Sequence, residues 1–413
     1  MLKPSTSIFL VILLSWSNKP AAGLSLKNDN GISKQINIRR WRHLDPEIDM
    51  NASELITSKG YPCEEYTVKT GDGYLLGIQR IPFGSKNSST PRPVAFLQHG
   101  LLCTSTNWLT NLPNESLAFI LADAGYDVWL GNVRGNTYSR RHVNYSVNSE
   151  EFWAFSWDHH ASSDLPAMVN FVLNKTGQSQ LHYIGHSQGT LMAFAHMSTN
   201  PEFAKKLKGF YALGPVATVG HMKSIPLKIL SDIPTAILYD MFGKKDFLPN
   251  NELIDFLAKT VCDEATRFIC SDIIFVIAGY DKAQLNMTRL PVYIAHTPAG
   301  TSAQNMIHFQ QMVIHGEFRM FDYGSPKANR EHYNGQSTPP YYDARKVQAP
   351  TYLYYGGKDL LADPQDVKSL MALLPNLKGS QLIPSFDHLD FIWGMDAYDF
   401  VYKNVIEAMK SLD

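Results

Sequence analysis

Residues 185–189, with the sequence GHSQG, constrain the fold of this chain more than any other stretch. They fit the pattern G-x-S-x-G, in which a serine occupies a sharp turn between a strand and a helix. Such a pentapeptide arises by chance in roughly one chain in ten of this length, as a glycine-rich turn with a solvated serine. Here residues 181–184 predict a short strand, and residues 190–197 predict a helix that ends before Pro201. We therefore expect a strand–turn–helix unit with Ser187 at its apex.

Apolar runs and helical patterns alternate on both sides of this turn. Strands are predicted where the apolar runs lie, at residues 65–69, 74–80, 94–98, 126–130, 181–184, 210–213, 351–355 and 381–383. The first two of these are separated by a glycine-rich turn and predict a β-hairpin. Helices are predicted at residues 117–122, 164–173, 190–197, 364–374 and 397–409. This alternation predicts an α/β fold of the α/β-hydrolase type, with a mostly parallel sheet covered by helices on both faces.

Two of the predicted helices have candidate N-caps. Ser116 precedes the helix at 117–122, and Asp396 precedes the last helix. We expect the last helix to pack one apolar face into the core, formed by Ala397, Phe400, Val401, Val405, Ile406 and Met409.

The strand–helix alternation stops at Gly214-Pro215. Residues 217–343 are rich in proline and aromatic residues and contain short helical patterns such as 252–257. We interpret this segment as an inserted, mainly helical cap or lid over the active edge of the sheet. The hydrolase core is then predicted to consist of residues 24–216 and 344–413.

The N-terminus has the pattern of a secretory signal peptide. Lys3 precedes an apolar run at 8–14, and small residues follow at 21–23, so residues 1–23 are predicted to be removed after Gly23. The run is too short to span a bilayer, and no later run is long enough. We expect a protein of the secretory pathway, lysosomal or extracellular, without a transmembrane anchor. An uncleaved N-terminal anchor is the alternative.

Glycosylation and disulfide formation become possible in that pathway. Six N-x-S/T sequons predict glycans on exposed loops, at Asn51, Asn87, Asn114, Asn144, Asn174 and Asn286. Among the cysteines, Cys262 and Cys270 are the favoured pair because their bond would close a short loop. We expect Cys63 and Cys103 to be free thiols.

Charge and motif content argue against two other classes of protein. The net charge is −1 and the charged residues are mixed along the chain, whereas a nucleic-acid-binding protein would carry a basic face or tail. The spacings C-x-x-C and H-E-x-x-H do not occur, so we predict neither a zinc site nor another cofactor.

A serine hydroxyl needs a base within hydrogen-bonding reach and an acid that orients the base. On this kind of sheet the three groups follow in the order serine, acid, histidine. Asp359 follows the strand at 351–355 through a Gly-Gly turn, and His388 follows the last strand. Asp363 is the rival acid, but an aspartate directly before proline is a better helix N-cap.

Two further histidines flank the serine, His182 and His186, and strand alternation predicts that both point elsewhere. The oxyanion of an acyl-transfer intermediate needs backbone donors. We predict the N–H groups of Gln188, directly after the serine, and of Leu101, in the loop after the strand at 94–98. His99 in that loop is expected to be structural.

Eight segments resemble, in the same order, the acid lipases of the gastric and lysosomal type. They are residues 97–102, 111–114, 119–125, 151–156, 185–190, 300–302, 357–363 and 388–394. The resemblance runs from about Asn51 to the C-terminus. The chain departs from the family pattern at Val133, where serine is usual, and at Asp158-His159-His160.

The resemblance implies an α/β-hydrolase core with a mobile cap and lid. It implies hydrolysis of triacylglycerols and, for the lysosomal type, of cholesteryl esters. The family's catalytic residues fall on Ser187, Asp359 and His388, and its oxyanion donors fall on Leu101 and Gln188. Its cap disulfide would fall near Cys262 and Cys270.

The leading hypothesis is therefore a serine lipase that acts on neutral lipid esters and binds a lipid–water interface through its cap. Apolar residues of the cap could line a lipid path or simply pack the cap onto the core: Phe242, Phe247, Leu248, Phe268, Ile273, Ile274, Phe275 and Ile277. Acyl transfer to an alcohol is one alternative. A lipid carrier on an inactive hydrolase scaffold is another, disfavoured because all three catalytic positions are filled. The sequence makes no prediction of oligomeric state.

Overall fold

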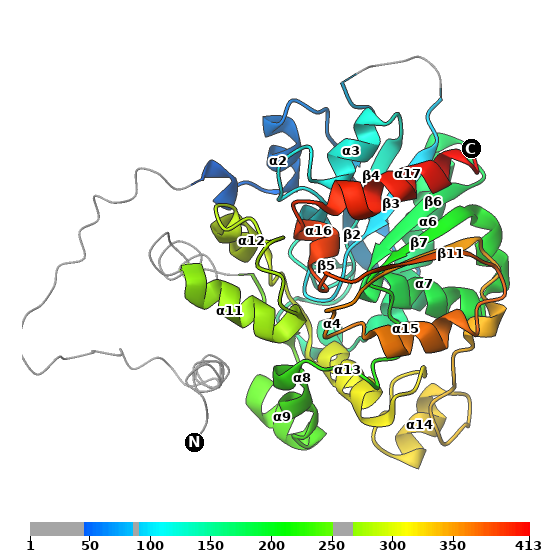
Figure 1. Cartoon of the computed structure of the whole chain (residues 1–413). Coiled ribbons are helices and arrows are strands. Elements are labelled where there is room, and N and C mark those ends of the chain that lie inside the picture. The colour runs from blue at the N-terminus through cyan, green and yellow to red at the C-terminus, as the bar shows by residue number, and fades with distance from the viewer. Residues whose placement is uncertain (1–44, 86–90, 251–266) are drawn as a thin grey trace, which may run out of the picture.

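A mixed β-sheet forms the centre of the computed structural model, which describes residues 45–85, 91–250 and 267–413 (Figure 1). Within these ranges the sheet has nine strands in the order β1-β2-β4-β3-β6-β7-β10-β11, with β5 paired to β2. The strands are β1 Glu64–Lys69, β2 Tyr74–Ile81, β3 Val94–Gln98, β4 Asp127–Gly131, β5 Arg141–His142, β6 Leu181–His186, β7 Leu207–Leu213, β10 Thr351–Gly356 and β11 Leu377–Ile383.

Six neighbouring strands of the sheet, β4, β3, β6, β7, β10 and β11, are parallel to one another. The antiparallel part lies at one edge, where β1 pairs with β2 as the predicted hairpin and β2 pairs with β4. The prediction of a mostly parallel sheet is therefore confirmed. Because parallel strands end at the same edge, the loops after β3, β6, β7, β10 and β11 lie near one another.

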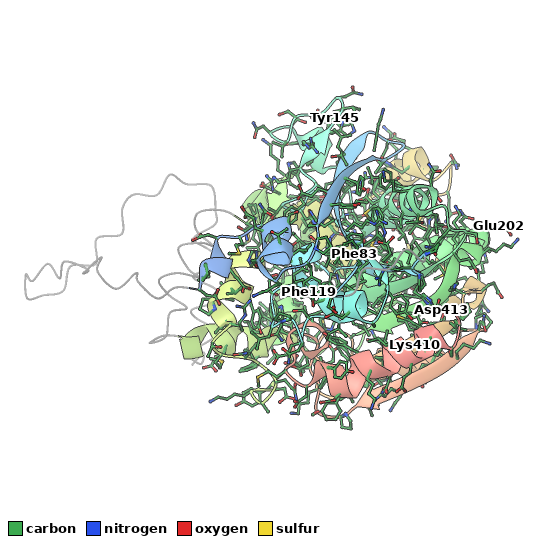
Figure 2. The ribbon with its side chains drawn as sticks, turned by 90° about the horizontal axis from the view of Figure 1, so that it is seen from above. Phe83, Phe119, Tyr145, Glu202, Lys410 and Asp413 are labelled. Carbon is green, nitrogen blue, oxygen red and sulfur yellow. The ribbon has the colours of Figure 1, made fainter. Side chains whose placement is uncertain are left out.

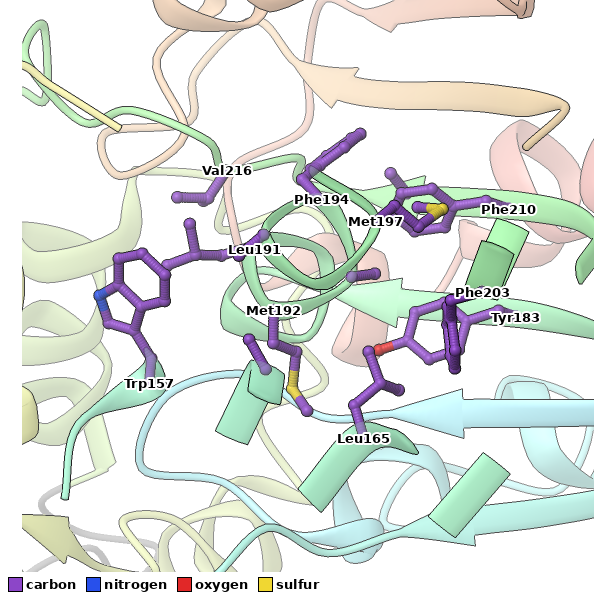
Figure 3. Close-up of a cluster of buried hydrophobic side chains, with 14 of the residues drawn as sticks. Trp157, Leu165, Tyr183, Leu191, Met192, Phe194, Met197, Phe203, Phe210 and Val216 are labelled. Carbon is purple, nitrogen blue, oxygen red and sulfur yellow. The ribbon is translucent and has the colours of Figure 1, made fainter. Parts of the chain in front are cut away.

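Alternate residues of each central strand enter two different hydrophobic clusters. In β3, Phe96 belongs to one cluster, whereas Ala95 and Leu97 belong to the other. The central strands are buried along their full length, as expected of a sheet covered on both faces. Figure 3 shows part of the first cluster, in which side chains of α7 meet residues such as Leu165 and Phe210.

Helices of the core cover both faces of the sheet. Those that contribute to the first cluster are α6 Leu165–Thr176, α7 Gln188–Thr199 and α15 Pro364–Met371. Those that contribute to the second are α2 Ala52–Ser58, α3 Leu117–Asp123, α16 Asp390–Trp393 and α17 Lys403–Lys410. Shorter helical segments outside the long segment between β7 and β10 are α4 Glu150–Trp153, α5 Trp157–His159, η2 Pro46–Ile48, η3 Ser105–Trp108, η4 His160–Asp164, η5 Pro201–Lys206 and η8 Tyr398–Tyr402, and η7 Ala344–Lys346 lies at the end of that segment.

A long segment separates β7 from β10, and we call its residues 214–350 the insert. In Figure 1 its helices lie below the sheet and to its left. Its described elements are α8 Ile225–Ser231, α9 Thr235–Phe242, β8 Asp246–Phe247, α11 Arg267–Ala278, α12 Leu290–His296, β9 Thr301–Ser302, α13 Ala303–His315 and α14 Pro326–His332. The two short strands pair with each other. The predicted helix at 252–257 lies outside the described residues.

The C-terminal helix differs from its prediction. Residues Tyr398–Tyr402 form a π-helical turn that leads into α17, and the side chain of Phe400 is 44% exposed. The other five residues of the predicted apolar face are buried. Asp396 is not the N-cap, because its carboxylate accepts a hydrogen bond from the Gln284 amide at 2.9 Å. The wider π-turn rotates Phe400 out of the stripe that a regular helical period predicts.

The predicted cap at Ser116 is correct in position only. Ser116 occupies the N-cap position of α3, but its side chain makes no capping hydrogen bond. By contrast, Asn51 caps α2 through a reciprocal pair of bonds with Glu54. Position alone therefore does not establish that a serine side chain caps a helix.

Cys63 and Cys103 are both free, as predicted. The predicted disulfide lies outside the described residues, because neither Cys262 nor the side chain of Cys270 is described. The signal peptide at 1–23 and the sequon at Asn87 lie outside them as well. Among the described sequons, Asn51, Asn114, Asn144 and Asn174 are exposed and Asn286 is half-buried. No helix within the described ranges is long and apolar enough to cross a bilayer.

Candidate active site

Ser187 lies at the apex of a strained turn between β6 and α7. Its backbone angles, φ 53° and ψ −119°, fall in a region that side-chain-bearing residues rarely adopt. A Cβ on Gly185 would lie 2.8 Å from the carbonyl oxygen of Gly189, and a Cβ on Gly189 would lie 2.4 Å from the carbonyl oxygen of Gln98. Both glycines are therefore required, and the sharp turn follows from their lack of side chains.

His388 and Asp359 form a buried hydrogen-bonded pair. The His388 Nδ1 atom lies 2.8 Å from the Asp359 Oδ2 atom. The other carboxylate oxygen of Asp359 accepts the backbone N–H groups of Leu361 and Ala362, both at 2.8 Å. Two backbone donors thus fix the carboxylate and leave Oδ2 directed at the imidazole.

The rival acid, Asp363, has a different place. Its carboxylate accepts the backbone N–H of Gln365 at 2.8 Å, so it is the N-cap of α15. Its place directly before Pro364 predicts this role. Of the two candidate acids, the structure brings only Asp359 to His388.

The His388–Asp359 pair lies beside the serine turn. The backbone N–H of Ser187 donates to the carbonyl of Leu213, the last residue of β7, at 3.0 Å. A Cβ on the next residue, Gly214, would lie 3.2 Å from the His388 ring and 3.6 Å from Asp359 Oδ2. The three predicted catalytic residues therefore lie near one another at the carboxyl edge of the sheet, around the end of β7.

His186 does not point away from this edge, contrary to the prediction from strand alternation. Its Nε2 atom lies 2.9 Å from the carbonyl oxygen of His388, and the centroids of the two imidazole rings are 4.8 Å apart. Burial, with His388 nearby, holds the pKa of His186 well below its ordinary value. The ring is therefore neutral and its Nε2–H supports the backbone of His388. The strained turn at the next residue breaks the alternation that the prediction assumed.

His182 does lie elsewhere, as predicted. Its Nε2 atom is 2.9 Å from the carboxylate of Asp413, which also accepts hydrogen bonds from Lys208 and Tyr126. Figure 2 labels Asp413 close to Lys410 of the C-terminal helix. This histidine belongs to a polar contact at the far end of β6.

The loop after β3 passes directly against the serine. A Cβ on Gly100 would lie 3.0 Å from the Cβ of Ser187. Leu102 has a positive φ of 59°, and its carbonyl accepts the backbone N–H of Ala299 at 2.7 Å. Leu101, between these two residues, is thus held close to the turn. Leu101 and Gln188 flank Ser187 from two elements, as an oxyanion hole requires.

His99 has the structural role that was expected. Its Nδ1–H donates to the carbonyl of Gly100 at 2.8 Å, and its Nε2 accepts the backbone N–H of Val133 at 3.3 Å. Burial lowers the pKa of His99 to about 4, so it remains neutral in this role. It fixes the loop that carries Leu101.

Two acidic residues that sequence reasoning did not select hold the backbone on each side of His388. The Asp387 N–H donates to the Asp390 carboxylate at 2.6 Å, and the Asp387 carboxylate accepts the N–H groups of Leu389 and Asp390 at 2.8 and 3.2 Å. Burial, with Asp387 close by, raises the pKa of Asp390. The D-x-x-D spacing of Asp387 and Asp390 is the signal that could have identified this reciprocal lock.

The fold and the serine turn define the α/β-hydrolase class. A family profile described as "alpha/beta hydrolase fold" matches residues 93–395, and one described as "Partial alpha/beta-hydrolase lipase region" matches residues 52–112. A soluble variant of monoglyceride lipase from Saccharomyces cerevisiae shares this fold, with a TM-score of 0.50 and 15% sequence identity, over 85% of this chain and 95% of that chain.

Sequence relatives narrow the class. The chain is 55% identical to gastric triacylglycerol lipase of Homo sapiens over 367 residues, which cover 88% of this chain and 92% of the relative. It is 50% identical to lysosomal acid lipase/cholesteryl ester hydrolase of Homo sapiens over 370 residues, which cover 89% and 92%. The chain therefore belongs to the acid lipase family of α/β-hydrolases.

Proposed function

We propose that this protein is a serine lipase that hydrolyses neutral lipid esters through Ser187, His388 and Asp359. The hydrogen bond between His388 and Asp359 at 2.8 Å, beside the strained serine turn, is the observation that carries the proposal. In this proposal Asp359 orients His388 as the base, and the strained turn presents the Ser187 hydroxyl as the nucleophile.

The pairing of His388 determines which of its nitrogens acts as the base. Because Nδ1–H donates to Asp359, Nε2 carries the free lone pair that takes the proton of Ser187. Ser187 Oγ then attacks the ester carbonyl, and the backbone N–H groups of Leu101 and Gln188 stabilise the oxyanion. His388 returns the proton to the departing alcohol, which leaves an acyl-enzyme.

Hydrolysis of the acyl-enzyme repeats these steps with water as the nucleophile. His388 removes a proton from the water, the second oxyanion is stabilised by the same donors, and the fatty acid leaves Ser187. Asp359 orients the imidazole and stabilises the imidazolium. Its two backbone donors, Leu361 and Ala362, hold the carboxylate in place.

The relatives support neutral lipids as substrates. One is named a triacylglycerol lipase and another a cholesteryl ester hydrolase, each about half identical to this chain. We propose triacylglycerols as the main substrate class and cholesteryl esters as the second.

We further propose that the insert acts as a cap and that its α8–α9 region contacts the lipid–water interface. Large apolar side chains are exposed there, with Ile225 62%, Ile229 39% and Ile237 47% accessible. Such a group of exposed apolar residues is typical of a surface that binds lipid. The cap residues named from sequence fit this role less well, since Phe247 and Phe275 are buried.

The family membership and the N-terminal signal pattern support a location in the secretory pathway, in lysosomes or outside the cell. The four exposed sequon asparagines are accessible to glycosylation there. We propose a glycoprotein with glycans on Asn51, Asn114, Asn144 and Asn174.

Replacement of the serine tests the proposed function. Ser187→Ala should lower kcat on tributyrin and on p-nitrophenyl butyrate by at least about 10³-fold, because the nucleophile is lost. Ser198→Ala is the matched control, since Ser198 lies on the same helix and its hydroxyl accepts the backbone N–H of Asp343 instead. Full activity of Ser187→Ala would refute the mechanism.

A further inference from the structure

A buried hydrogen bond connects the insert to the residue that follows the serine. Asn305 lies in the first turn of α13, and its Nδ2 atom donates to the side-chain Oε1 of Gln188 at 2.8 Å. Both side chains are almost completely inaccessible, at 0% and 1%. Gln188 is the first residue of α7 and carries one of the two proposed oxyanion donors.

The amide of Asn305 is fixed by its other partners. Its Oδ1 atom accepts the backbone N–H of Trp157 at 2.7 Å, and its Nδ2 also donates to Thr301 Oγ1 at 3.0 Å. Its own backbone N–H donates to Ser302 Oγ at 3.0 Å. Asn305 therefore cannot turn away from Gln188 without leaving buried polar groups unpaired.

The bond between Asn305 and Gln188 restrains the backbone next to the strained residue Ser187. A backbone conformation such as that of Ser187 is strained and persists only where its surroundings hold it. The N–H groups of the first helical turn have no partners within the helix, which leaves the Gln188 N–H available for an oxyanion. Ser187 N bonds to Leu213 on one side of the turn, and Gln188 bonds to Asn305 on the other.

We propose that Asn305 is a positioning residue for the oxyanion hole, which makes the chemical step depend on the placement of α13 against the serine turn. The inference rests on the proposed function, because it assigns Asn305 to the same reaction. Loss of a whole oxyanion donor lowers kcat by about 10²–10³-fold. If the donor is present but poorly positioned, kcat should fall by less, about 10–100-fold, with little change in KM.

The test compares two substitutions on the same helix. Asn305→Leu removes the bond to Gln188, whereas Gln310→Leu removes another buried amide of α13, which bonds to the Ile233 carbonyl and not to the serine turn. Both are assayed with p-nitrophenyl butyrate, and active sites are counted by titration with a serine-reactive phosphonate. We expect kcat per titrated site to fall about 10–100-fold for Asn305→Leu and to stay within about twofold of wild type for Gln310→Leu.

A double substitution separates positioning from a general loss of structure. If Asn305 acts through the Gln188 side chain, Gln188→Ala alone should lower kcat similarly, and the double variant should be no slower than the slower single variant. The Gln188→Ala variant also tests the bond from the α7 side if Asn305→Leu does not fold. Multiplied effects in the double variant, or an unchanged kcat in both single variants, would overturn the inference.

These outcomes are distinct from failure of the proposed function. If wild type and Ser187→Ala are equally active, the proposed function itself fails. If activity requires Ser187 but Asn305→Leu behaves like Gln310→Leu, only the role of Asn305 is refuted.

Discussion

Two regions of the insert are attached to the core in opposite ways. The α12–α13 region, residues 289–315, joins the core through buried polar bonds. The α8–α9 region, residues 224–243, buries only Pro226 within α8 and Leu238 within α9 and exposes several isoleucines. The insert thus contains one region that contacts the serine turn through Asn305 and another that exposes apolar side chains.

Arg289 shows how the α12–α13 region is held. This buried residue pairs with Asp45 at 2.7 Å and with Glu47, and its guanidinium also donates to the carbonyl of Thr110. Nearby, the Tyr293 hydroxyl donates to the Asn111 side chain at 2.9 Å. These bonds fix α12 against the core.

The largest effect is expected from breaking the Arg289 contacts. Arg289→Met should lower the free energy of unfolding by about 3–5 kcal/mol, because the buried Glu47 keeps only Lys59 as a cationic partner and the Thr110 carbonyl loses its donor. Urea denaturation followed by tryptophan fluorescence measures this change. Arg345→Met removes an exposed arginine paired with Asp343 and should leave the midpoint near that of wild type. Equal midpoints for the two variants would mean that α12 is not anchored as described.

A second test concerns the end of the insert, where Asp158 of α5 holds it to the core. The Asp158 carboxylate accepts the Phe321 N–H and the Tyr342 hydroxyl, both at 2.8 Å, and His308 lies 3.9 Å away. Burial raises the pKa of Asp158 from 3.8 to about 7, although both hydrogen bonds lower it. The folded state therefore binds this proton more tightly than the unfolded chain, which favours folding in acid.

The contribution of Asp158 is complete below pH 3.8 and is lost as the pH rises through about 7. Asp158→Asn removes this titration. Between pH 4 and 7.5 the stability of wild type should fall relative to the variant by an amount on the order of 3 kcal/mol. Urea midpoints at pH 4, 5.5 and 7.5 measure the difference. Asp240→Asn, at an exposed site of α9, is the control, and parallel pH profiles for wild type and Asp158→Asn would refute the prediction.

The smallest effect on stability is expected in the α8–α9 region. The double variant Ile225→Ser, Ile229→Ser should change the free energy of unfolding by less than about 0.5 kcal/mol, because both side chains are exposed. Its activity on a triacylglycerol emulsion should fall about fivefold or more, since it buries less apolar area in lipid. Activity on soluble p-nitrophenyl butyrate should stay within about twofold.

Ile314→Ser is the matched control, because Ile314 is 56% exposed but lies on α13. It should leave emulsion activity unchanged. If both variants lose emulsion activity equally, the lipid-facing surface is not confined to α8 and α9.

Sequence patterns predicted the core of the fold because buried parallel strands appear as continuous apolar runs, such as Val94–Gln98. They could not predict two-residue strands such as β8 and β9, which are too short to show a period. The π-turn at Tyr398–Tyr402 changed the helical phase, and Phe400 was misplaced for that reason. Local regularity was predictable, and local departures from it were not.

In the active site, too, some features could be predicted from the sequence and others could not. Chain order and a capping argument selected Asp359 over Asp363, and the hydrogen bond to His388 agrees with that choice. The Asn305–Gln188 bond joins residues 117 positions apart, and no local pattern marks either side chain as a partner of the other. His186 was misjudged because strand alternation fails where the strained turn begins.

The contact between Asp413 and His182 has a practical consequence for deletion experiments. The side-chain carboxylate of Asp413 lies 2.9 Å from Nε2 of a fully buried histidine on the strand that leads into the serine turn. Deletion of Asp413 would leave that histidine without its acidic partner. Shortened variants should therefore retain Asp413 if a change in their activity is to be assigned to another residue.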